Sequence, residues 1–357
     1  MIQASLSQIL NNWIAGETPS PAEYQFLAAR TLAKSDRGEA FGITPDNVKE
    51  VIETRSHLFQ AVYRDILSLP SFTTTFPNQQ ALISLWDLWL PLATQLASHR
   101  QQLGHPLIQG ILGGQGTGKT TLANVLSWIL AHLGYRTLSL SLDDLYKTYE
   151  EREKLREQDP RLILRGPPGT HDVELGLQLL DQLRQANRKT PILVPRFDKS
   201  IRNGAGDRTL SETVSDVDIV LFEGWFVGVR PINSAVFEGM TPAPIQTLTD
   251  RLFAHDMNER LKKYLPLWEK LDSLIILYPT DYRLSLKWRN QAEKQMIATG
   301  KSGMTDSQIS DFVNYFWKSL HPELFIAPLT KNPTLVDLVI EINPDHTIGA
   351  LYRPQES

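Results

Sequence analysis

A glycine-rich stretch at residues 113–120 constrains the fold of this chain more than any other feature. It reads Gly-Gly-Gln-Gly-Thr-Gly-Lys-Thr and matches Gly-x-x-x-x-Gly-Lys-Thr, the pattern of the phosphate-binding P-loop. An apolar run at 107–112 precedes it and indicates a buried strand. Apolar residues spaced three and four apart from Leu122 to Leu133 follow it and indicate a helix. Strand, loop and helix in this order are the context that the motif requires.

The residue types of this loop suit the binding of nucleotide phosphates. Glycines allow backbone conformations that other residues avoid, so main-chain N–H groups can point at a phosphate from close by. The helix that begins near Gly118 adds its positive N-terminal end. In such loops the lysine, here Lys119, reaches the β- and γ-phosphates, and the next hydroxyl, here Thr120, binds Mg²⁺. We therefore predict a nucleotide site formed by Gly113, Gly114, Gln115, Gly116, Thr117, Gly118, Lys119, Thr120 and Thr121.

Composition narrows the class of protein around this site. The 357 residues are 41% hydrophobic and 21% charged, which is typical of a globular protein with a large core. With 36 basic and 40 acidic residues the formal charge is −4, so nothing predicts an extended nucleic-acid surface. The absence of cysteine excludes disulfides, thiolate zinc sites and thiol catalysis. No secretory signal or bilayer-spanning stretch is found and no protein partner is evident, so we expect a cytoplasmic enzyme that acts on a small molecule.

The first part of the chain reads as helices. Residues 1–100 are expected to form a helical extension, with a capping box at 20–23 and a helix that starts at residues 44–45. Trp86 and Trp89 lie one turn apart on a further helix and are predicted to be core rather than a base-stacking platform. We predict no chemistry in this region.

From residue 101 to residue 357 strands and helices alternate. Strands are expected at 107–112, 136–143, 191–195, 217–222, 274–277 and 335–342, the last one in a hairpin with 347–352. This rhythm predicts an α/β fold of the three-layer P-loop NTPase type, with a mainly parallel sheet and helices on both faces. Ligands of such sheets bind beyond the carboxyl ends of the strands, so the residues that follow the strands are the next candidates.

Acidic residues follow three of the predicted strands. Asp143 and Asp144 end the second, Glu223 ends the strand at 217–222, and Asp281 follows the strand at 274–277. An acid at such a position can bind Mg²⁺ or accept the proton of an attacking hydroxyl, and it can also simply cap a helix. Two acids on neighbouring strands beside a P-loop favour function for Asp143 and Glu223. Capping explains Asp281 better, and Asp144 fits either role.

Two loops are rich in groups that bind anions. One spans residues 165–172 and the other runs from 195 to 208, and both place cations among prolines and glycines. Arginine clamps a small carboxylate or phosphate with two parallel hydrogen bonds. Ordinary surface connections would explain these charges as well. On this basis the predicted acceptor-binding residues are Asp144, Tyr146, Arg165, Thr170, His171, Asp172, Arg196, Asp198, Lys199 and Arg208.

A basic helical segment follows residue 282. Arg283, Lys287 and Arg289 lie near the expected phosphate site, and a mobile lid would bring one of them onto the transferred phosphoryl group. We take Arg289 as the candidate catalytic cation, although a solvated basic helix face explains each of the three equally well.

Taken together, these motifs resemble the D-glycerate 3-kinases of plants and cyanobacteria. The resemblance runs from the P-loop to the end of the chain, and the order and spacing of the motifs make it specific. It rests on Gly113–Thr120, Leu142-Asp-Asp-Leu-Tyr146, Arg165-Gly-Pro-Pro-Gly-Thr-His-Asp172, Pro195-Arg-Phe-Asp-Lys-Ser200, Gly206-Asp-Arg208, Phe222-Glu-Gly-Trp225 and Trp288-Arg-Asn-Gln-Ala-Glu293. The wider group is that of uridine kinase and phosphoribulokinase.

The resemblance implies a reaction and roles. The family transfers the γ-phosphoryl group of ATP to D-glycerate with Mg²⁺, giving 3-phosphoglycerate and ADP, a step of photorespiratory salvage in photosynthetic organisms. It implies that Asp143 is the base, that Glu223 and Thr120 serve the metal, and that residues 101–357 form the P-loop kinase domain. Lys119 and Arg289 complete the predicted catalytic set.

Alternative functions remain open at this stage. One is a kinase of the same group with another hydroxylated acceptor, such as uridine, pantothenate or a sugar phosphate. Another is a nucleotide-driven switch that hydrolyses ATP or GTP. In the relatives the loop corresponding to Pro195–Asp198 is followed by a histidine, whereas Lys199 follows here, which argues against a nucleoside or ribulose phosphate. No Asn-Lys-x-Asp or Leu-Ser-Gly-Gly-Gln motif supports a switch.

Overall fold

The computed structural model describes residues 5–69, 78–185, 190–298 and 303–355. Its central sheet is formed by six strands: β1 (Leu107–Gly113), β2 (Thr137–Ser141), β7 (Ile219–Gly224), β8 (Ser273–Pro279), β9 (Leu338–Ile342) and β10 (Ile348–Tyr352). Their order across the sheet is β10-β9-β8-β1-β7-β2. All neighbours are parallel except β9 and β10, which form the expected hairpin. The mainly parallel sheet predicted from the alternating pattern is confirmed.

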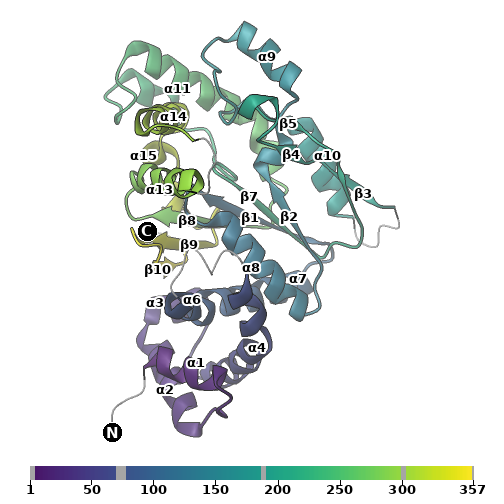
Figure 1. The fold of residues 1–357 in the computed structure, drawn as a ribbon, viewed down its shortest axis with the longest axis vertical. Coiled ribbons are helices and arrows are strands. Elements are labelled where there is room, and N and C mark those ends of the chain that lie inside the picture. The colour runs from purple at the N-terminus through teal and green to yellow at the C-terminus, as the bar shows by residue number, and fades with distance from the viewer. Residues whose placement is uncertain (1–4, 70–77, 186–189, 299–302, 356–357) are drawn as a thin grey trace.

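Helices cover both faces of this sheet (Figure 1). Side chains alternate along β1: Leu107 and Ile111 belong to one hydrophobic core, and Ile108 and Leu112 belong to the other. The first core is completed by α7 (Leu90–Gln102) and α8 (Lys119–His132), and the second by α10 (Val173–Leu183), α11 (Leu248–Leu261) and α12 (Leu265–Trp268). A strand buried on both faces in this way reads as a continuous apolar run, which is why 107–112 was recognisable in the sequence.

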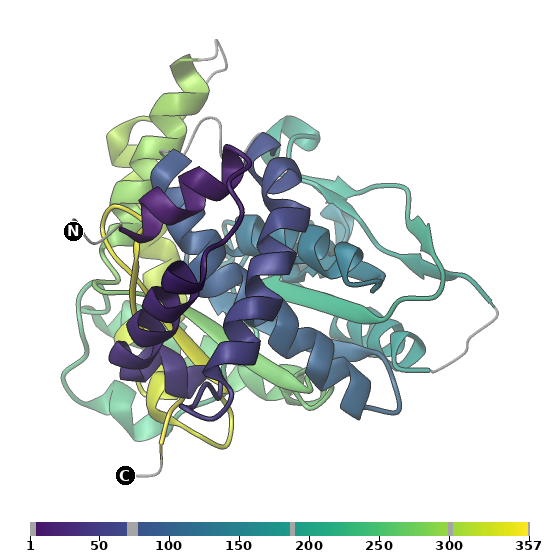
Figure 2. The ribbon, with the colours of Figure 1, turned by 90° about the horizontal axis from the view of Figure 1, so that it is seen from below.

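The N-terminal helices lie together at one side of the sheet, below it in Figure 1 and in front of it in Figure 2. They are α1 (Leu6–Ile14), α2 (Pro21–Ala33), α3 (Ser35–Ala40), α4 (Val48–Ser68) and α6 (Asn78–Ser84). The predicted capping box is present, because Ser20 and Glu23 exchange side-chain and backbone hydrogen bonds. Trp86 and Trp89 are buried in a short π-helix, Leu85–Trp89, which confirms their prediction as core residues.

The helix expected at residues 44–45 begins later, at Val48. The residues before it form a turn in which the side chain of Asn47 accepts a hydrogen bond from the N–H of Thr44 and donates one to the carbonyl of Gly42. An asparagine side chain that bonds to nearby backbone in this way competes with helix formation, so the helix starts after it.

The strand predicted at 191–195 exists but lies outside the central sheet. It is β3 (Ile192–Val194), which pairs antiparallel with β6 (Glu212–Val214) in a separate two-stranded ribbon. Leu193 is 65% exposed between two buried neighbours, so only one face of β3 is covered. A second ribbon joins β4 (Phe197–Asp198) to β5 (Asp207–Arg208) within the predicted cation-rich loop.

The remaining helices lie over the carboxyl end of the sheet. They are α9 (Tyr149–Gln158), α13 (Leu284–Ala298), α14 (Asp306–Ser319) and α15 (Pro322–Phe325). The long helix expected at about 250–270 is interrupted by a 3₁₀ turn, Lys262–Tyr264, which comes directly before α12. Pro266 lies at the start of α12 and lacks an N–H to continue an α-helix from the preceding turn.

Candidate active site

Three neighbouring strands bring the predicted site residues to one edge of the sheet. Glu223 near the end of β7 pairs in register with Ile111 of β1 and with Ser141 of β2. The P-loop follows β1 and Asp143 lies in a 3₁₀ turn, Leu142–Leu145, directly after β2. The predicted loop, base and metal ligand therefore converge where a parallel sheet of this kind binds its ligands.

The P-loop has the backbone shape that its glycines predict. Gly116 and Gly118 have φ of +77° and +89°, the left-handed region that favours glycine. Thr117 is buried and its hydroxyl donates to the carbonyl of Gly114, which holds the loop closed (2.8 Å). The Nζ of Lys119 donates to the same carbonyl at 3.0 Å. The lysine is thus folded back over the loop that would hold the phosphates.

The buried position of Lys119 lowers its pKa. The carboxylates of Glu223 and Asp143 oppose this effect on its ammonium group. A lysine that faces two carboxylates from inside a glycine loop is poised to receive a phosphate anion, because the anion would replace the lost hydration of the ammonium group.

Thr120 and Glu223 meet as a pair of oxygen ligands. The Thr120 hydroxyl donates to Glu223 Oε1 at 3.3 Å. A hydroxyl and a carboxylate suit Mg²⁺, which takes oxygen ligands, keeps several waters and uses nucleotide phosphates to complete its shell. No cluster of three or more His, Cys, Asp and Glu side chains that could hold a metal occurs in the described parts of the chain. A hydroxyl and one carboxylate fit a magnesium ion that phosphates and water also bind.

Asp143 lies between a cation and a hydroxyl. The Nζ of Lys199 is 2.5 Å from its Oδ2, and the hydroxyl of Tyr146 donates a hydrogen bond to the same carboxylate. Burial raises the pKa of Asp143, but the Lys199 ammonium and the hydrogen bond from the Tyr146 hydroxyl together hold it below its ordinary value. Asp143 is therefore an ionised carboxylate at neutral pH.

Tyr146 and His171 form a buried aromatic wall beside Asp143. Their rings stack with centroids 4.5 Å apart, and the Nδ1 of His171 lies 2.9 Å from the hydroxyl of Tyr264. Burial lowers the pKa of His171 to about 3, so its ring is neutral. Its Nε2 is buried and has no hydrogen-bond partner among the described residues. Tyr264 is a site residue that the sequence did not reveal, because it lies in a short turn with no motif around it.

The predicted acceptor arginines bind mainly to the protein itself. Arg196 contacts Asp144 at 2.8 Å, Glu212 at 2.5 Å and the carbonyl of Ser139. Arg208 bonds to Asp172 at 2.9 Å and to the carbonyl of Tyr146. These two guanidinium groups therefore fasten the cation-rich loop to the end of β2. Whether they also bind an acceptor stays a prediction.

Arg165 is half-buried and likewise binds to the protein itself. Its guanidinium donates to the carbonyls of Gly204 and Ala205 and lies over the ring of Phe197. Arg152, which the sequence did not single out, donates to the carbonyls of Ala205 and Gly206 from α9. The loop backbone at 204–206 is thus held by two arginines from different elements.

Three further predicted acceptor residues are used for local structure. Asp144 accepts from the N–H of Ser141, Thr170 bonds to the backbone of its own Pro/Gly turn, and Asp198 bonds to Ser200. Asp281 accepts from the N–H of Arg283 in the turn before α13, so its side chain serves this turn and not the first residues of the helix.

Helix α13 packs on the P-loop through Ser285 and Trp288, for which the sequence predicts no individual role. A Cβ on Gly116 would lie 2.6 Å from the Cβ of Trp288, and one on Gly114 would lie 3.2 Å from the Oγ of Ser285. Arg289, the predicted lid cation, bonds to Glu293 at 2.9 Å and lies over Phe312. The helix is therefore in place against the loop, while its predicted cation is paired within the helix.

The chain is similar in sequence to known kinases. No family model matches the chain. Among curated proteins it is 29% identical over 341 residues to the chloroplastic D-glycerate 3-kinase of Arabidopsis thaliana, covering 90% of this chain and 71% of that protein. It is 30% identical over 253 residues to an uncharacterized kinase of Schizosaccharomyces pombe, covering 67% of this chain and 90% of that protein. Among the described residues, no helix combines the length and apolar character that crossing a bilayer would require.

A solved structure extends the similarity to the fold. The D-glycerate 3-kinase of Cryptococcus neoformans is 32% identical, with a TM-score of 0.65, and the match covers 73% of this chain and 95% of that one. The similarity therefore holds in sequence and in structure over most of the chain. The chain belongs to the D-glycerate 3-kinase family of P-loop kinases.

Proposed function

We propose that this protein transfers the γ-phosphoryl group of ATP to D-glycerate, giving 3-phosphoglycerate and ADP, with Mg²⁺ as the metal. Two relatives from a plant and a fungus carry the name D-glycerate 3-kinase, which supports this acceptor. The P-loop, with Lys119 and the Thr120–Glu223 pair, supports a nucleotide and a magnesium ion.

The pair formed by Asp143 and Lys199 is the observation that carries the proposal. D-glycerate is a hydroxy acid, so it offers a hydroxyl that needs an acceptor and a carboxylate that needs a cation. Asp143 and Lys199 present these two groups side by side, 2.5 Å apart, at the carboxyl edge of β2. Lys199 is 60% exposed and its long side chain can leave Asp143 to meet the carboxylate of the acceptor.

Each group of the site then has a task in phosphoryl transfer. The backbone of the P-loop and Lys119 orient the phosphates, and Asp143 accepts the hydrogen bond and then the proton of the attacking hydroxyl. When bound, Mg²⁺ would neutralise charge on the phosphates from the side of Thr120 and Glu223. A strong base is not required, because the transition state is loose and depends mainly on positioning and charge. The low pKa of Asp143 is compatible with that role.

Tyr146 and His171 would complete the acceptor side. The hydroxyl of Tyr146 keeps the carboxylate of Asp143 in place, and the unpartnered Nε2 of His171 offers a neutral hydrogen-bonding group next to it. Arg165, Arg196 and Arg208 would act by holding the loop that carries Lys199, and Arg289 would have to leave Glu293 to reach a phosphate.

The division of the chain and its location are part of the same proposal. Residues 101–357 would be the kinase domain and residues 1–100 a helical extension packed on it. A cytoplasmic location, and the absence of nucleic-acid and protein partners, remain predictions, and the Arabidopsis relative is named as chloroplastic.

An acceptor screen tests the proposal directly. The full-length protein is incubated with ATP and Mg²⁺ and with D-glycerate, L-glycerate, uridine, pantothenate or ribulose 5-phosphate, and ADP release is measured. We expect rapid turnover with D-glycerate and slow turnover with the other four. Preference for another acceptor would keep the kinase class and replace the substrate. ATP turnover that is independent of every acceptor would instead indicate a nucleotide-driven switch and contradict the proposal.

A further inference from the structure

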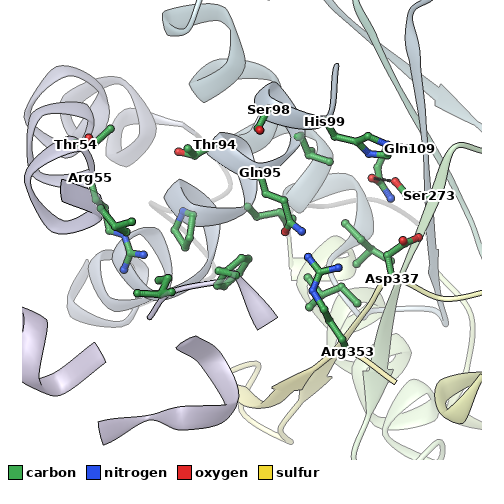
Figure 3. Close-up of a pocket in the computed structure, with 18 of the residues that line it drawn as sticks. Thr54, Arg55, Thr94, Gln95, Ser98, His99, Gln109, Ser273, Asp337 and Arg353 are labelled. Atoms are coloured by element: carbon green, nitrogen blue, oxygen red, sulfur yellow. Dashed lines mark hydrogen bonds between the residues drawn. The ribbon is translucent and has the colours of Figure 1, made fainter. Parts of the chain in front are cut away.

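A cavity of about 710 Å³ lies far from the P-loop, between the N-terminal helices and the sheet. Its walls come from α4 and α7 on one side and from the first residues of β8 and β9 on the other, with Gln109 of β1 between them. Since β1 runs from Gln109 toward Gly113, the cavity lies at the opposite end of this strand from the nucleotide site. Figure 3 shows Arg55 entering from one side and Arg353 from the other, with Gln95 between them.

Arg55 is a buried cation without an anion of its own. Its residue is 7% exposed, its guanidinium lies 5.5 Å from the ring centre of Trp86, and its hydrogen bond to the carbonyl of Trp86 is long at 3.5 Å. Within the described residues it forms no ion pair. Burial lowers its pKa to about 10, opposed by the charge of Asp87.

The nearest acid is already occupied. Asp87 pairs with Arg30 at 2.7 Å, Arg37 at 3.0 Å and Lys34 at 3.4 Å. The carboxylate of Asp87 therefore already pairs with three cations, and Arg55 is not one of them. Burying a cation that has no ion-pair partner of its own is unfavourable. Arg55 therefore gains strongly from any anion that enters the cavity.

Two further groups point to the chemistry of such an anion. Arg353 donates its Nε–H to the carbonyl of Ala40, and its guanidinium forms no ion pair among the described residues. The side-chain oxygen of Gln95 is buried and has no hydrogen-bond partner there. Figure 3 shows the amide of Gln95 directed toward the guanidinium of Arg353. An arginine binds carboxylate or phosphate groups, and a carbonyl oxygen accepts a hydrogen bond from a hydroxyl or an N–H group.

The acids and the imidazole that line the cavity do not cancel this preference. Glu50 and Asp337 are exposed at its rim, and Asp337 already accepts from the N–H of Leu274. His99 is half-buried on α7. Arg55 is thus the buried charge of the cavity, while Arg353 lies exposed at the rim with the two acids.

We propose that this cavity is a second binding site that takes a hydroxylated organic anion, with Arg55 and Arg353 bound to its acidic groups and Gln95 to a hydroxyl. The volume is within the range of about 300–1,000 Å³ that small-molecule sites have. Apolar side chains such as Val51, Leu92 and Leu338 would cover the carbon skeleton. The site is separate from the nucleotide and acceptor sites and does not depend on the proposed reaction.

Calorimetric titration of the full-length protein tests the site. The probes are citrate, glucose 6-phosphate and glucose 1-phosphate, with glycerol as the neutral control. At least one anionic probe is expected to bind the wild-type protein, and Arg353→Gln, Gln95→Leu and Arg55→Met should each weaken that binding about tenfold or more, as loss of a charge-assisted or buried hydrogen bond predicts. Arg156→Gln, an exposed arginine on α9, is the matched control and should bind as the wild type does.

Two active-site variants locate the binding. Lys119→Ala and Lys199→Met should leave the affinity for that probe unchanged. The proposal is overturned if none of the three anions binds, if glycerol binds as well as they do, or if binding is lost in Lys119→Ala or Lys199→Met and kept in Arg353→Gln. Should Arg55→Met fail to fold, the exposed Arg353 and the half-buried Gln95 still decide the outcome.

Discussion

At the scale of single residues, catalysis is predicted to depend on Asp143 more than on any other acid. Its carboxylate is the only strand-end acid of the site that contacts both Lys199 and Tyr146 in the described part of the chain. Replacing it with asparagine removes the proton acceptor but leaves the P-loop intact. Asp143→Asn should lower kcat by about 10²- to 10⁴-fold, the usual contribution of a general base, with ATP affinity almost unchanged.

The measurement is kcat with D-glycerate together with the Kd of ATP. Asp181→Asn, an exposed acid on α10 that pairs with Lys270, is the matched control and should keep wild-type kinetics. Near-normal turnover in Asp143→Asn would move the base to another group.

Lys199 is predicted to set the pH range in which the base works. It is the largest influence that lowers the pKa of Asp143 against burial. In Lys199→Met, burial acts with less opposition, so the pKa of Asp143 rises and less of the base is ionised in mild acid. The acidic limb of the kcat/KM profile should therefore move to higher pH.

The linked effect on stability has the same origin. A carboxyl whose pKa is lowered in the folded state stabilises the protein above its unfolded pKa, and this contribution is lost as the pH falls through the folded value. Lys199→Met should therefore lose less stability on acidification than the wild type. Lys262→Met, on the exposed pair with Glu259, is the control. An acidic limb that stays in place would contradict the assignment.

Residue types and spacing predicted part of this site and could not predict the rest. Lys119, Asp143 and Glu223 were recognisable because each lies at or beyond the carboxyl end of a strand, and parallel strands end at one edge. The partners of Arg196 were not, because Asp144, Glu212 and Ser139 come together only through the fold of the loop at 195–214. A cation in a loop reads the same in sequence whether it faces a substrate or fastens the loop.

At the scale of elements, the contact between the P-loop and α13 is predicted to affect nucleotide binding. Gly116→Ala places a Cβ 2.6 Å from the Cβ of Trp288, so the loop or the helix must move. Gly134→Ala is the matched control, since its φ is +86° and no atom lies within 4 Å of the added Cβ. Both substitutions bear the left-handed strain of about 1–2 kcal/mol, but only the first also disturbs packing.

Thermal unfolding and the KM for ATP separate these two effects. Both variants should lower Tm, and only Gly116→Ala should also raise the KM for ATP, by several-fold. An equal KM in the two variants would show that the contact with α13 has no influence on the nucleotide site.

Elements were predicted well where the local pattern was strong. The strand and helix around the P-loop, β1 and α8, were recognised from an apolar run and a periodic stripe. The stretch at 191–195 has the same apolar character, but the neighbours of β3 are set by β6 far along the chain, so its place outside the main sheet could not be inferred. Val48 starts α4 later than expected because one side chain, Asn47, competes with the helix.

At the scale of the whole molecule, Asp87 is predicted to hold the N-terminal helices together. It is buried in the π-helix, with its side chain 5% exposed, and pairs with Arg30, Lys34 and Arg37 from α2, α3 and the turn between them. Burial alone would raise the pKa of Asp87. The hydrogen bond from Arg30 and the charges of Arg30, Lys34 and Arg37 outweigh this effect, so the pKa lies below its ordinary value and Asp87 is ionised. Asp87→Asn should reduce the free energy of unfolding by about 3–5 kcal/mol, the scale of a broken buried pair.

Urea denaturation at neutral pH measures this loss. Asp65→Asn removes a 51% exposed acid that pairs with His132 between α4 and α8, and it should cost at most about 1 kcal/mol. Because the pKa of Asp87 is lowered, the difference between Asp87→Asn and the wild type should shrink as the pH falls below the usual range of a carboxyl. Equal losses in the two variants would contradict a central role for Asp87.

The order of the strands has a consequence for how the protein is made. The P-loop strand β1 is the first strand of the described chain, yet its two neighbours come much later: Leu107 pairs with Ile219, and Gln109 pairs with Ser273. A ribosome adds about 5–20 residues per second, so β1 and its loop leave the tunnel long before either partner exists. During synthesis the catalytic loop is therefore carried by an unpaired apolar strand, and it becomes a phosphate site only when most of the chain has been translated.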